Sequence, residues 1–422
     1  MSEPGGSQRP RLIDVLATPK MLAILVLGAA SGFPNQITES ALQAWLKDTG
    51  VSNTTIGIMT YVALPYLLKP LWAPLIDRYP LPLLGRRRGW ILAMQLALAA
   101  AIALYAVQNP AAALAPFAVC ALAITFCSAT QDIAYDAYRT DVTTPSERGL
   151  AAAAVNLGYR SSAWIASAIA LVVAQHYGWR MAFLILAGVM LAFTVATMRA
   201  PSSHIHYQPR SLQESIVQPL RELLGTPSAL TLIAVVLLFK VGDAFANKLF
   251  TPFMMDVGFS KQEIGLIVKA LFTVSALTGS VLGGIFMVRL GLLRSMLAFG
   301  FLQALSNLLY CALAVAGKSY AVMVAAVVVE HIAGAMGNIA LVALIMALCD
   351  VRYSAFQYAL LSALALLPRY GLGYPAGWTA DHGGWYVYYV VSFVLALPGL
   401  AMVWWNRRHI EALDQERSAV PA

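Results

Sequence analysis

The sequence predicts an all-α, polytopic membrane protein with twelve transmembrane helices arranged as two six-helix repeats. Its composition is the first indication: 59% of the 422 residues are hydrophobic and only 11% are charged, too few charges to cover a water-soluble domain of this size. Apolar runs of 18 or more residues recur along the whole chain, and each can cross a hydrocarbon layer about 30 Å thick. A motif that occurs twice, described below, divides these runs into two halves.

Twelve apolar runs are expected to span the membrane, with ends good to a few residues. They cover about 21–46, 54–76, 89–108, 112–138, 149–175, 181–199, 228–253, 262–288, 295–316, 320–348, 354–379 and 384–405. The expected domains are an N-terminal tail (1–20), a first six-helix bundle (21–199), a linker (200–227), a second six-helix bundle (228–405) and a C-terminal tail (406–422). The linker is the one long polar connection, and an amphipathic helix is expected around 211–224.

The basic residues in the connections predict the orientation. The two tails and the connections after the even-numbered runs hold most of them, whereas the opposite side holds only Lys47, Arg180, Lys261 and Lys318. Because basic loops remain cytoplasmic, both termini are expected on the cytoplasmic side. The formal net charge of +8 follows from this asymmetry, and its scatter over short loops argues against a nucleic-acid partner.

Two similar segments indicate an internal duplication. KDTGVSNTTIG (47–57) and MDVGFSKQEIG (255–265) share Asp, Gly, Ser, Ile and Gly at positions 208 apart, and each is expected in the external loop after the first run of its half. Arg160 in NLGYR and Arg369 in LLPRYG recur 209 positions apart. Parallel six-helix repeats around a central pathway resemble the architecture of the major facilitator superfamily.

The connection between runs 2 and 3 contains candidate gating residues. DRYPLPLLGRRRGW (77–90) resembles the superfamily's cytoplasmic signature of Asp-Arg followed by Gly and a basic run. Asp77, next to Arg78, can accept hydrogen bonds from a helix N-terminus or from basic side chains and so hold the halves together. The alternative is that the arginines at 86–88 only set the topology. Lys69 lies between two prolines, where the helix can bend, and is a third gating candidate.

Ionisable residues within the runs predict a polar pathway through the centre. Burying such a group in the bilayer costs at least about 2.5–3.5 kcal/mol on insertion scales, so each needs a partner or a function. Runs 3, 6, 9 and 12, which should face lipid in a two-repeat transporter, hold none. We therefore expect the acids and bases to converge on one shared, hydrated interior. They are Glu39, Lys69, Asp132, Asp136, Arg160, Lys240, Asp243, Lys248, Lys269, Glu330 and Arg369.

The five acids among these residues are the candidates for proton coupling. Asp132 and Asp136 lie one helical turn apart, which favours sharing of a proton and suits a proton carrier. The alternative is that they form fixed bridges with Arg139 or Arg160, and Asp136 is the more structural of the two. The other candidates are Glu39, Asp243 and Glu330.

Several of the charged positions allow more than one interpretation. Glu330 has no partner visible in its own run, and its neighbour His331 is either a packing residue or part of a relay. Lys269 falls toward the external end of run 8, where its side chain can extend to the membrane surface. Lys240 and Asp243, three residues apart, form an internal pair that a ligand or a proton could open.

Amides beside acids predict a ligand rich in hydroxyl groups. After a break at Gly32 and Pro34, run 1 places Gln36, Glu39 and Gln43 on one helical face, although contacts between helices are an alternative role. The candidate ligand-binding residues are Gln36, Gln43, Gln131, Tyr135, Arg160, Lys240, Asn247 and Arg369. The full Gly-x-x-x-x-Gly-Lys-Ser/Thr pattern of a phosphate-binding loop is lacking, as are metal-ligand spacing and a nucleophile with a partner. We therefore expect no ATP, metal, cofactor or enzymatic activity.

Several stretches together resemble the AmpG muropeptide permeases, over about residues 20–405. They include LQAWLKDTGV, LKPLWAPLIDRYPLPLLGRRRGW, FCSATQDIAYDAYRTDV, KVGDAFA and GGIFMVRLGLLR. The resemblance implies proton-driven import of anhydro-muropeptides across the bacterial inner membrane for cell-wall recycling. It also places the family's acidic motif on Asp132 and Asp136. The alternative is a major facilitator importer of another organic ligand, such as a siderophore or small glycopeptide. A monomer in the lipid bilayer is expected.

Overall fold

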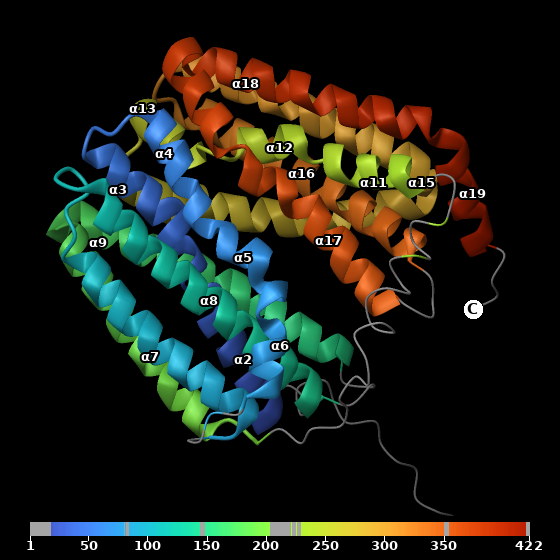
Figure 1. Ribbon diagram of the computed structural model, residues 1–422. Coiled ribbons are helices and arrows are strands. Elements are labelled where there is room, and N and C mark those ends of the chain that lie inside the picture. The colour runs from blue at the N-terminus through green and yellow to red at the C-terminus, as the bar shows by residue number, and fades with distance from the viewer. Residues whose placement is uncertain are drawn as a thin grey trace, which may run out of the picture.

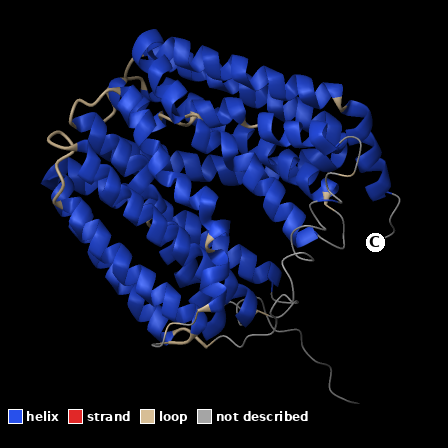
Figure 2. Ribbon diagram, in the orientation of Figure 1, coloured by secondary structure: helices blue, strands red, loops and turns tan. Residues whose placement is uncertain are grey.

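The computed structural model describes residues 18–79, 81, 84–143, 148–202, 221, 225, 229–349 and 354–418, and the regular elements in these ranges are helices (Figure 2). The helices form two groups that lie side by side (Figure 1). Helices α2 to α9 pack mainly on one another, as do α11 to α18. The domain boundaries stay a prediction, because most of the linker, including the amphipathic helix expected at 211–224, lies outside the described residues.

The first helix group contains one strongly interrupted segment, residues 53–78. Pro65 and Pro70 each fall in the first turn of a short helix, where a missing N–H does no harm, so the chain continues as a series of brief helices. A 3₁₀-helix begins at Lys69, so the α-helix is interrupted at the position where the sequence predicts that it can bend. The elements are α2 (Pro19–Gly32), η1 (Ile37–Ala41), α3 (Leu42–Asp48), α4 (Asn53–Met59), η2 (Thr60–Ala63), α5 (Leu64–Leu68), η3 (Lys69–Leu71), α6 (Ala73–Arg78), α7 (Arg86–Ala106), α8 (Leu114–Val142) and α9 (Arg148–Arg199).

The second helix group begins with a corresponding interrupted segment. Its first apolar run is divided among three helices, α11 to α13, with turns around Lys240 and Lys248. The elements are α11 (Ala229–Leu238), α12 (Val241–Ala246), α13 (Phe250–Asp256), α14 (Lys261–Glu263), η6 (Ile264–Val268), α15 (Lys269–Ala316), α16 (Tyr320–Leu348), α17 (Ser354–Gly371), α18 (Gly373–Trp405) and α19 (Arg407–Ser418).

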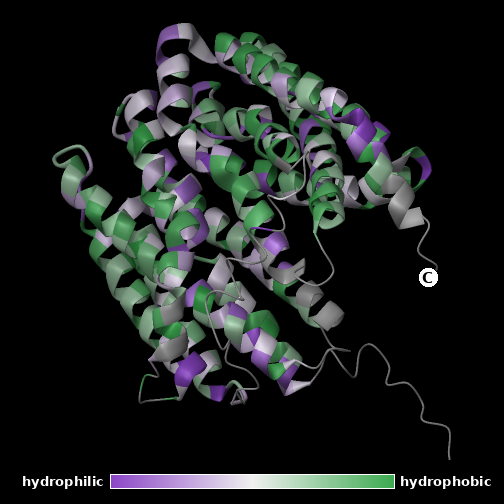
Figure 3. Cartoon of the chain, turned by 45° about the vertical axis from the view of Figure 1, so that its right-hand side comes forward, coloured by the Kyte–Doolittle hydropathy of each residue, from purple (hydrophilic) through white to green (hydrophobic). Residues whose placement is uncertain are grey.

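Eight segments of the described chain are long and apolar enough to cross a membrane, and hydrophobic residues dominate the helices (Figure 3). Three of them, Ala154–Arg199, Lys261–Ala316 and Leu360–Trp405, are long enough for two crossings. Each contains one glycine with a positive φ, at 81°, 74° and 72° respectively, where one helix ends and the next begins. Together with the interrupted segment at 53–78, these spans are consistent with the twelve predicted transmembrane helices.

One hydrophobic core contains residues of both helix groups, and its aromatic centres repeat. Trp45 packs on Tyr105 and Phe183, with ring centroids 5.3 and 5.0 Å apart. Phe253, 208 positions after Trp45, packs in the same way on Tyr389 at 4.8 Å. The other apolar clusters draw on one group alone. The two groups therefore share a core at the end formed by α3, α4, α13 and the N-terminal part of α18, here called the joined end (Figure 1).

Candidate functional site

Two ion pairs connect the helix groups at the joined end, and the repeated segments supply both acids. Lys261 Nζ lies 2.5 Å from Asp48 Oδ2, and Lys47 Nζ lies 2.6 Å from Asp256 Oδ2. Each aspartate also accepts a hydrogen bond from an indole of its own group. The indole donors are Trp179, 2.8 Å from Asp48, and Trp385, 3.0 Å from Asp256. Each aspartate thus connects a tryptophan of its own group with a lysine of the other.

A further contact at the joined end links α18 to α4. In the connection between the last two spans, Asp381 accepts hydrogen bonds from the backbone N–H groups of Asn53 (3.0 Å) and Thr54 (2.7 Å) and from the Thr54 hydroxyl (2.6 Å). Partial burial opposes ionisation, but these donors hold the pKa of Asp381 below its ordinary value. Close packing accompanies the contact, since a Cβ atom at Gly57 would lie 2.1 Å from the Gly373 carbonyl oxygen.

Deeper between the groups, Arg369 donates a hydrogen bond to the carboxylate of Glu39. Arg369 lies beside Pro368 near the end of α17, and Glu39 lies in the π-helix η1. The two side chains are 49% and 35% exposed, so solvent or a ligand can reach both partners. The structure therefore joins a proton-coupling candidate and a ligand-binding candidate across the two groups.

The three polar residues predicted on one face of run 1 are divided between two directions. Gln36 accepts a hydrogen bond from the Ser40 hydroxyl at 3.0 Å, and Ser40 in turn contacts α9 of the same group. Glu39 points to Arg369, whereas the Gln43 amide donates to a backbone carbonyl of the second group at 3.0 Å. The prediction assumed α-helical spacing; the π-helix over 37–41 holds more residues per turn and changes the register.

Within the first group, Asp132 of α8 accepts a hydrogen bond from the Ser31 hydroxyl, and Lys69 Nζ lies 3.9 Å from its Oδ2. Its side chain is 13% exposed. Asp136, one turn further on, pairs instead with Arg139 at 3.2 Å, which agrees with the bridging alternative for that residue. The two acids of α8 therefore have different cationic partners.

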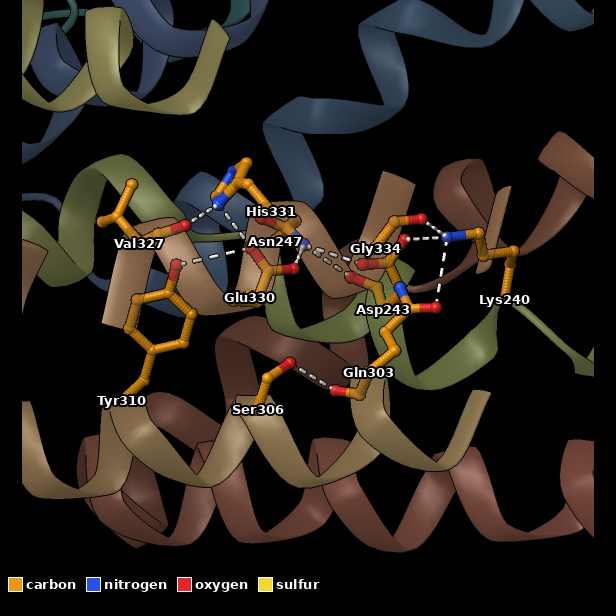
Figure 4. Close-up of polar contacts among 10 residues, drawn as sticks. All are labelled: Lys240, Asp243, Asn247, Gln303, Ser306, Tyr310, Val327, Glu330, His331 and Gly334. Atoms are coloured by element: carbon orange, nitrogen blue, oxygen red, sulfur yellow. Dashed lines mark hydrogen bonds and ion pairs between the residues drawn. The ribbon is translucent and has the colours of Figure 1, made fainter. Parts of the chain in front are cut away.

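The second group buries a connected cluster of polar side chains (Figure 4). Lys240 Nζ lies 3.2 Å from Asp243 Oδ2, which confirms the internal pair that the sequence predicts. The Asn247 amide donates to both Asp243 Oδ1 (3.1 Å) and Glu330 Oε1 (3.0 Å). His331 Nδ1 lies 2.6 Å from Glu330 Oε2. Glu330 therefore has a partner on its own helix after all, contrary to the expectation from the sequence.

The remaining predicted site residues have different surroundings. Gln131 and Tyr135 are only 1% and 2% exposed, and the Tyr135 hydroxyl donates to a backbone carbonyl of α2 at 2.7 Å. Arg160 is exposed, and among the described residues it makes no ion pair with the acids of α8. The side chains of Asp77 and Arg78 lie outside the described part of the chain, so a gate at those residues stays a prediction.

The expectation of one shared interior for all the charges is wrong in part. Asp132 with Lys69 lies in the first group, Glu39 with Arg369 lies between the groups, and the cluster around Glu330 is buried in the second group. Asp132, Glu39 and Arg369 all interact electrostatically with Tyr159, so these three charges border one interior. The Glu330 cluster is separate, because residues of its own group supply the hydrogen-bonding partners that a charge in a low-dielectric interior needs. Arg160 is exposed and Asp136 is half-exposed.

Known proteins resemble the chain over nearly its full length. Residues 24–255 match the family model for the Major Facilitator Superfamily. The anhydromuropeptide permease of Escherichia coli (strain K12) is 40% identical over 402 residues, which cover 94% of this chain and 82% of that protein. The transporter AmpG 4 of Rickettsia conorii is 30% identical over 401 residues, which cover 92% of this chain and 97% of that protein.

Solved structures share the fold at low sequence identity. A bacterial homolog of the human lysosomal transporter Spinster, inward-facing and unoccupied, gives a TM-score of 0.74 at 16% identity and covers 99% of this chain and 100% of its own. A D-xylose–proton symporter gives a TM-score of 0.70 at 14% identity, and the match covers 90% of this chain and 96% of that one.

Fold and family match together define a multi-pass membrane transporter, not an enzyme. Within the major facilitator superfamily, the chain belongs to the AmpG-like permease family.

Proposed function

We propose that this protein is a proton-coupled secondary transporter that imports anhydro-muropeptides from periplasm to cytoplasm for cell-wall recycling. The ligands would be N-acetylglucosamine linked to anhydro-N-acetylmuramic acid, with or without a stem peptide. The observation that carries the proposal is the 40% identity, over 94% of the chain, to the E. coli anhydromuropeptide permease. The asymmetry of basic loops supports a location in the bacterial inner membrane with both termini cytoplasmic.

Alternating access gives the joined end a role. In the proposed orientation it faces the periplasm, and its shared core and two lysine–aspartate pairs close the pathway on that side. Toward the cytoplasm the helix groups keep separate cores, which leaves that side free to open. Transport then requires the periplasmic contacts to break while new contacts form near the cytoplasm, where Asp77 and Arg78 are the gating candidates.

Charge balance across the membrane requires more than one proton-carrying acid. Moving one charge through a 100 mV potential is worth roughly 2.3 kcal/mol, and a monoanion that enters with one proton carries no net charge. The membrane potential can therefore drive uptake only when the protons outnumber the ligand's negative charges. We assign one proton to Asp132, whose cationic partner Lys69 is 3.9 Å away, and a second to the Asp243–Glu330 cluster of the other group.

Uptake into proteoliposomes tests the proposal. Vesicles with an inward proton gradient should accumulate labelled anhydro-muropeptide, and a protonophore or the substitution Asp132→Asn should abolish accumulation above equilibrium. Asp136→Asn is the matched control, because Asp136 is 48% exposed and already bridged to Arg139. Uptake that persists when the gradient is collapsed would reject proton coupling. Accumulation of a labelled siderophore or small glycopeptide in the same vesicles, with no accumulation of labelled muropeptide, would favour the alternative ligand.

A further inference from the structure

Four charged residues meet where helices of both groups are interrupted. Glu39 lies in the π-helix η1, and Lys269 is the first residue after the π-helix η6. Lys248 lies in the turn between α12 and α13, and Arg369 follows Pro368 near the end of α17. π-Helical segments and broken helices in the middle of a transporter frequently mark functional positions, because their backbone and side chains are free to contact a ligand.

Hydrogen bonds connect Glu39, Arg369 and Lys248, and Lys269 joins this cluster through its charge alone. Arg369 donates to the Glu39 carboxylate, and Lys248 Nζ donates to the Arg369 carbonyl oxygen at 2.5 Å. The charges of Lys248 and Lys269 are each attracted by Glu39 and repelled by Arg369. Sequence reasoning assigned no site role to Lys248 and allowed Lys269 to extend toward the membrane surface. The signal it missed is that both lysines adjoin interruptions in their helices.

The cluster carries an excess of positive charge. It sets three cations against one carboxylate, that of Glu39. The other acids of the described interior have partners of their own: Asp132 has Lys69, Asp243 has Lys240, and Glu330 has His331. An unbalanced charge at membrane depth is costly, so the cluster is complementary to an anion that arrives from outside the protein.

We propose that Arg369, Lys248 and Lys269 form a binding site for ligand carboxylates, with Glu39 as the resident counter-ion that a carboxylate replaces on Arg369. The inference rests on the proposed function and makes it more specific: the ligand is an anhydro-muropeptide that carries a free carboxylate. A guanidinium binds carboxylate in a bidentate geometry, so a ligand carboxylate competes directly with Glu39 for the same donors.

The exchange has a structural consequence. The Glu39–Arg369 pair connects the first helix group to the second, and a ligand carboxylate that takes the place of Glu39 removes this connection. In the loaded protein the ligand carboxylate would then be bound to Arg369, and its release would let Glu39 return to Arg369 and restore the direct connection.

Binding of two matched ligands to purified protein tests the site. One ligand is the labelled disaccharide–peptide with its free carboxylates, and the other is the same compound with every carboxylate converted to an amide. Because a hydrogen bond to a charged group is worth a factor of about ten or more in affinity, wild-type protein should bind the acid at least about tenfold more tightly than the amide. Lys248→Gln and Lys269→Gln should each lower affinity for the acid about tenfold and leave that for the amide nearly unchanged.

Glu39→Gln should change the affinity for the acid in the opposite direction to the lysine variants, which a merely structural role of Glu39 would not produce. It removes the competitor for Arg369 and should raise affinity for the acid while transport falls. Lys318→Gln is the matched control, because Lys318 pairs with Glu263 inside the second group, at 3.0 Å, away from the cluster. It should change neither affinity.

The outcomes separate the inference from the function on which it rests. Equal binding of acid and amide by wild-type protein overturns the carboxylate site while leaving muropeptide transport standing. Equal losses for both ligands in the two lysine variants likewise overturn it. Binding of neither form by wild-type protein shows instead that the proposed ligand is wrong, and the carboxylate site then falls with it.

Discussion

Replacing both Lys47 and Lys261 with glutamine should loosen the joined end without disturbing either helix group. Each lysine contacts an aspartate of the opposite group, at 2.6 and 2.5 Å, and the four side chains are 15–32% exposed. Pairs as exposed as these are partly screened and contribute up to about 1 kcal/mol each. If the two contributions add, the joined conformation loses about 2 kcal/mol, which raises the ratio of separated to joined molecules up to about thirtyfold.

Distances between spin labels at the joined end measure this ratio. Ala112, between α7 and α8, and Ala316, at the end of α15, are exposed and belong to different groups. Labels are attached to cysteines at these positions in a protein without its four native cysteines. The wild type should show mostly the distance of the joined conformation, and the double variant should show a larger population at longer distance. The difference should shrink in 1 M salt, where the Debye length falls to about 3 Å.

Two further variants decide whether the lysine–aspartate pairs cause the change. Lys318→Gln removes a lysine whose partner, Glu263, lies in the same group, so the distances should stay as in the wild type. Exchanging Lys47 and Asp256 by Lys47→Asp with Asp256→Lys should restore the short distance that either single change reduces. The reasoning is refuted if the double lysine variant keeps the wild-type distribution, or if Lys318→Gln shifts it equally.

Three other perturbations test close packing, protonation and burial. Gly373→Ala should separate the groups at the joined end, because the added Cβ would lie 2.2 Å from a backbone oxygen of α4. Gly188→Ala is the control: the space around Gly188 is open, so the spin-label distances should stay unchanged. In the joined conformation the pKa of Asp381 is below its ordinary value of 3.8. The hydrogen bonds that Asp381 accepts therefore stabilise the joined conformation above pH 3.8, and this stabilisation is lost as the pH falls through the lowered pKa. Asp381→Asn should abolish this pH dependence of the spin-label distances. Lys240→Met leaves Asp243 without its cationic partner and should cost about 3 kcal/mol of unfolding free energy. Adding Asp243→Leu should recover most of this loss in thermal unfolding.

Sequence reasoning located the buried charges but paired only those that are close in the chain. Lys240 and Asp243 are three residues apart, and helix geometry alone brings them together. Glu39 and Arg369 are 330 residues apart, so their pairing depends on how the two helix groups meet. The π-helix at 37–41 was equally hidden, because the apolar pattern of run 1 is compatible with ordinary α-helical spacing. Local periodicity therefore predicted the spans and the fold, whereas the contacts between the two helix groups could be identified only from the structure.

The pairs Lys47–Asp256 and Lys261–Asp48 at the joined end show which of the contacts between the groups can come from the internal duplication. Asp48 and Asp256 are equivalent, 208 positions apart, and each is bound by one lysine of the other group. The lysines are not equivalent: Lys47 precedes its group's aspartate by one residue, and Lys261 follows its own by five. Equivalent acids can be inherited through duplication, but non-equivalent lysines that complete the same crossed arrangement require separate origins. This argues that the bond between the groups, and not only the repeated sequence, has a function in holding the joined end.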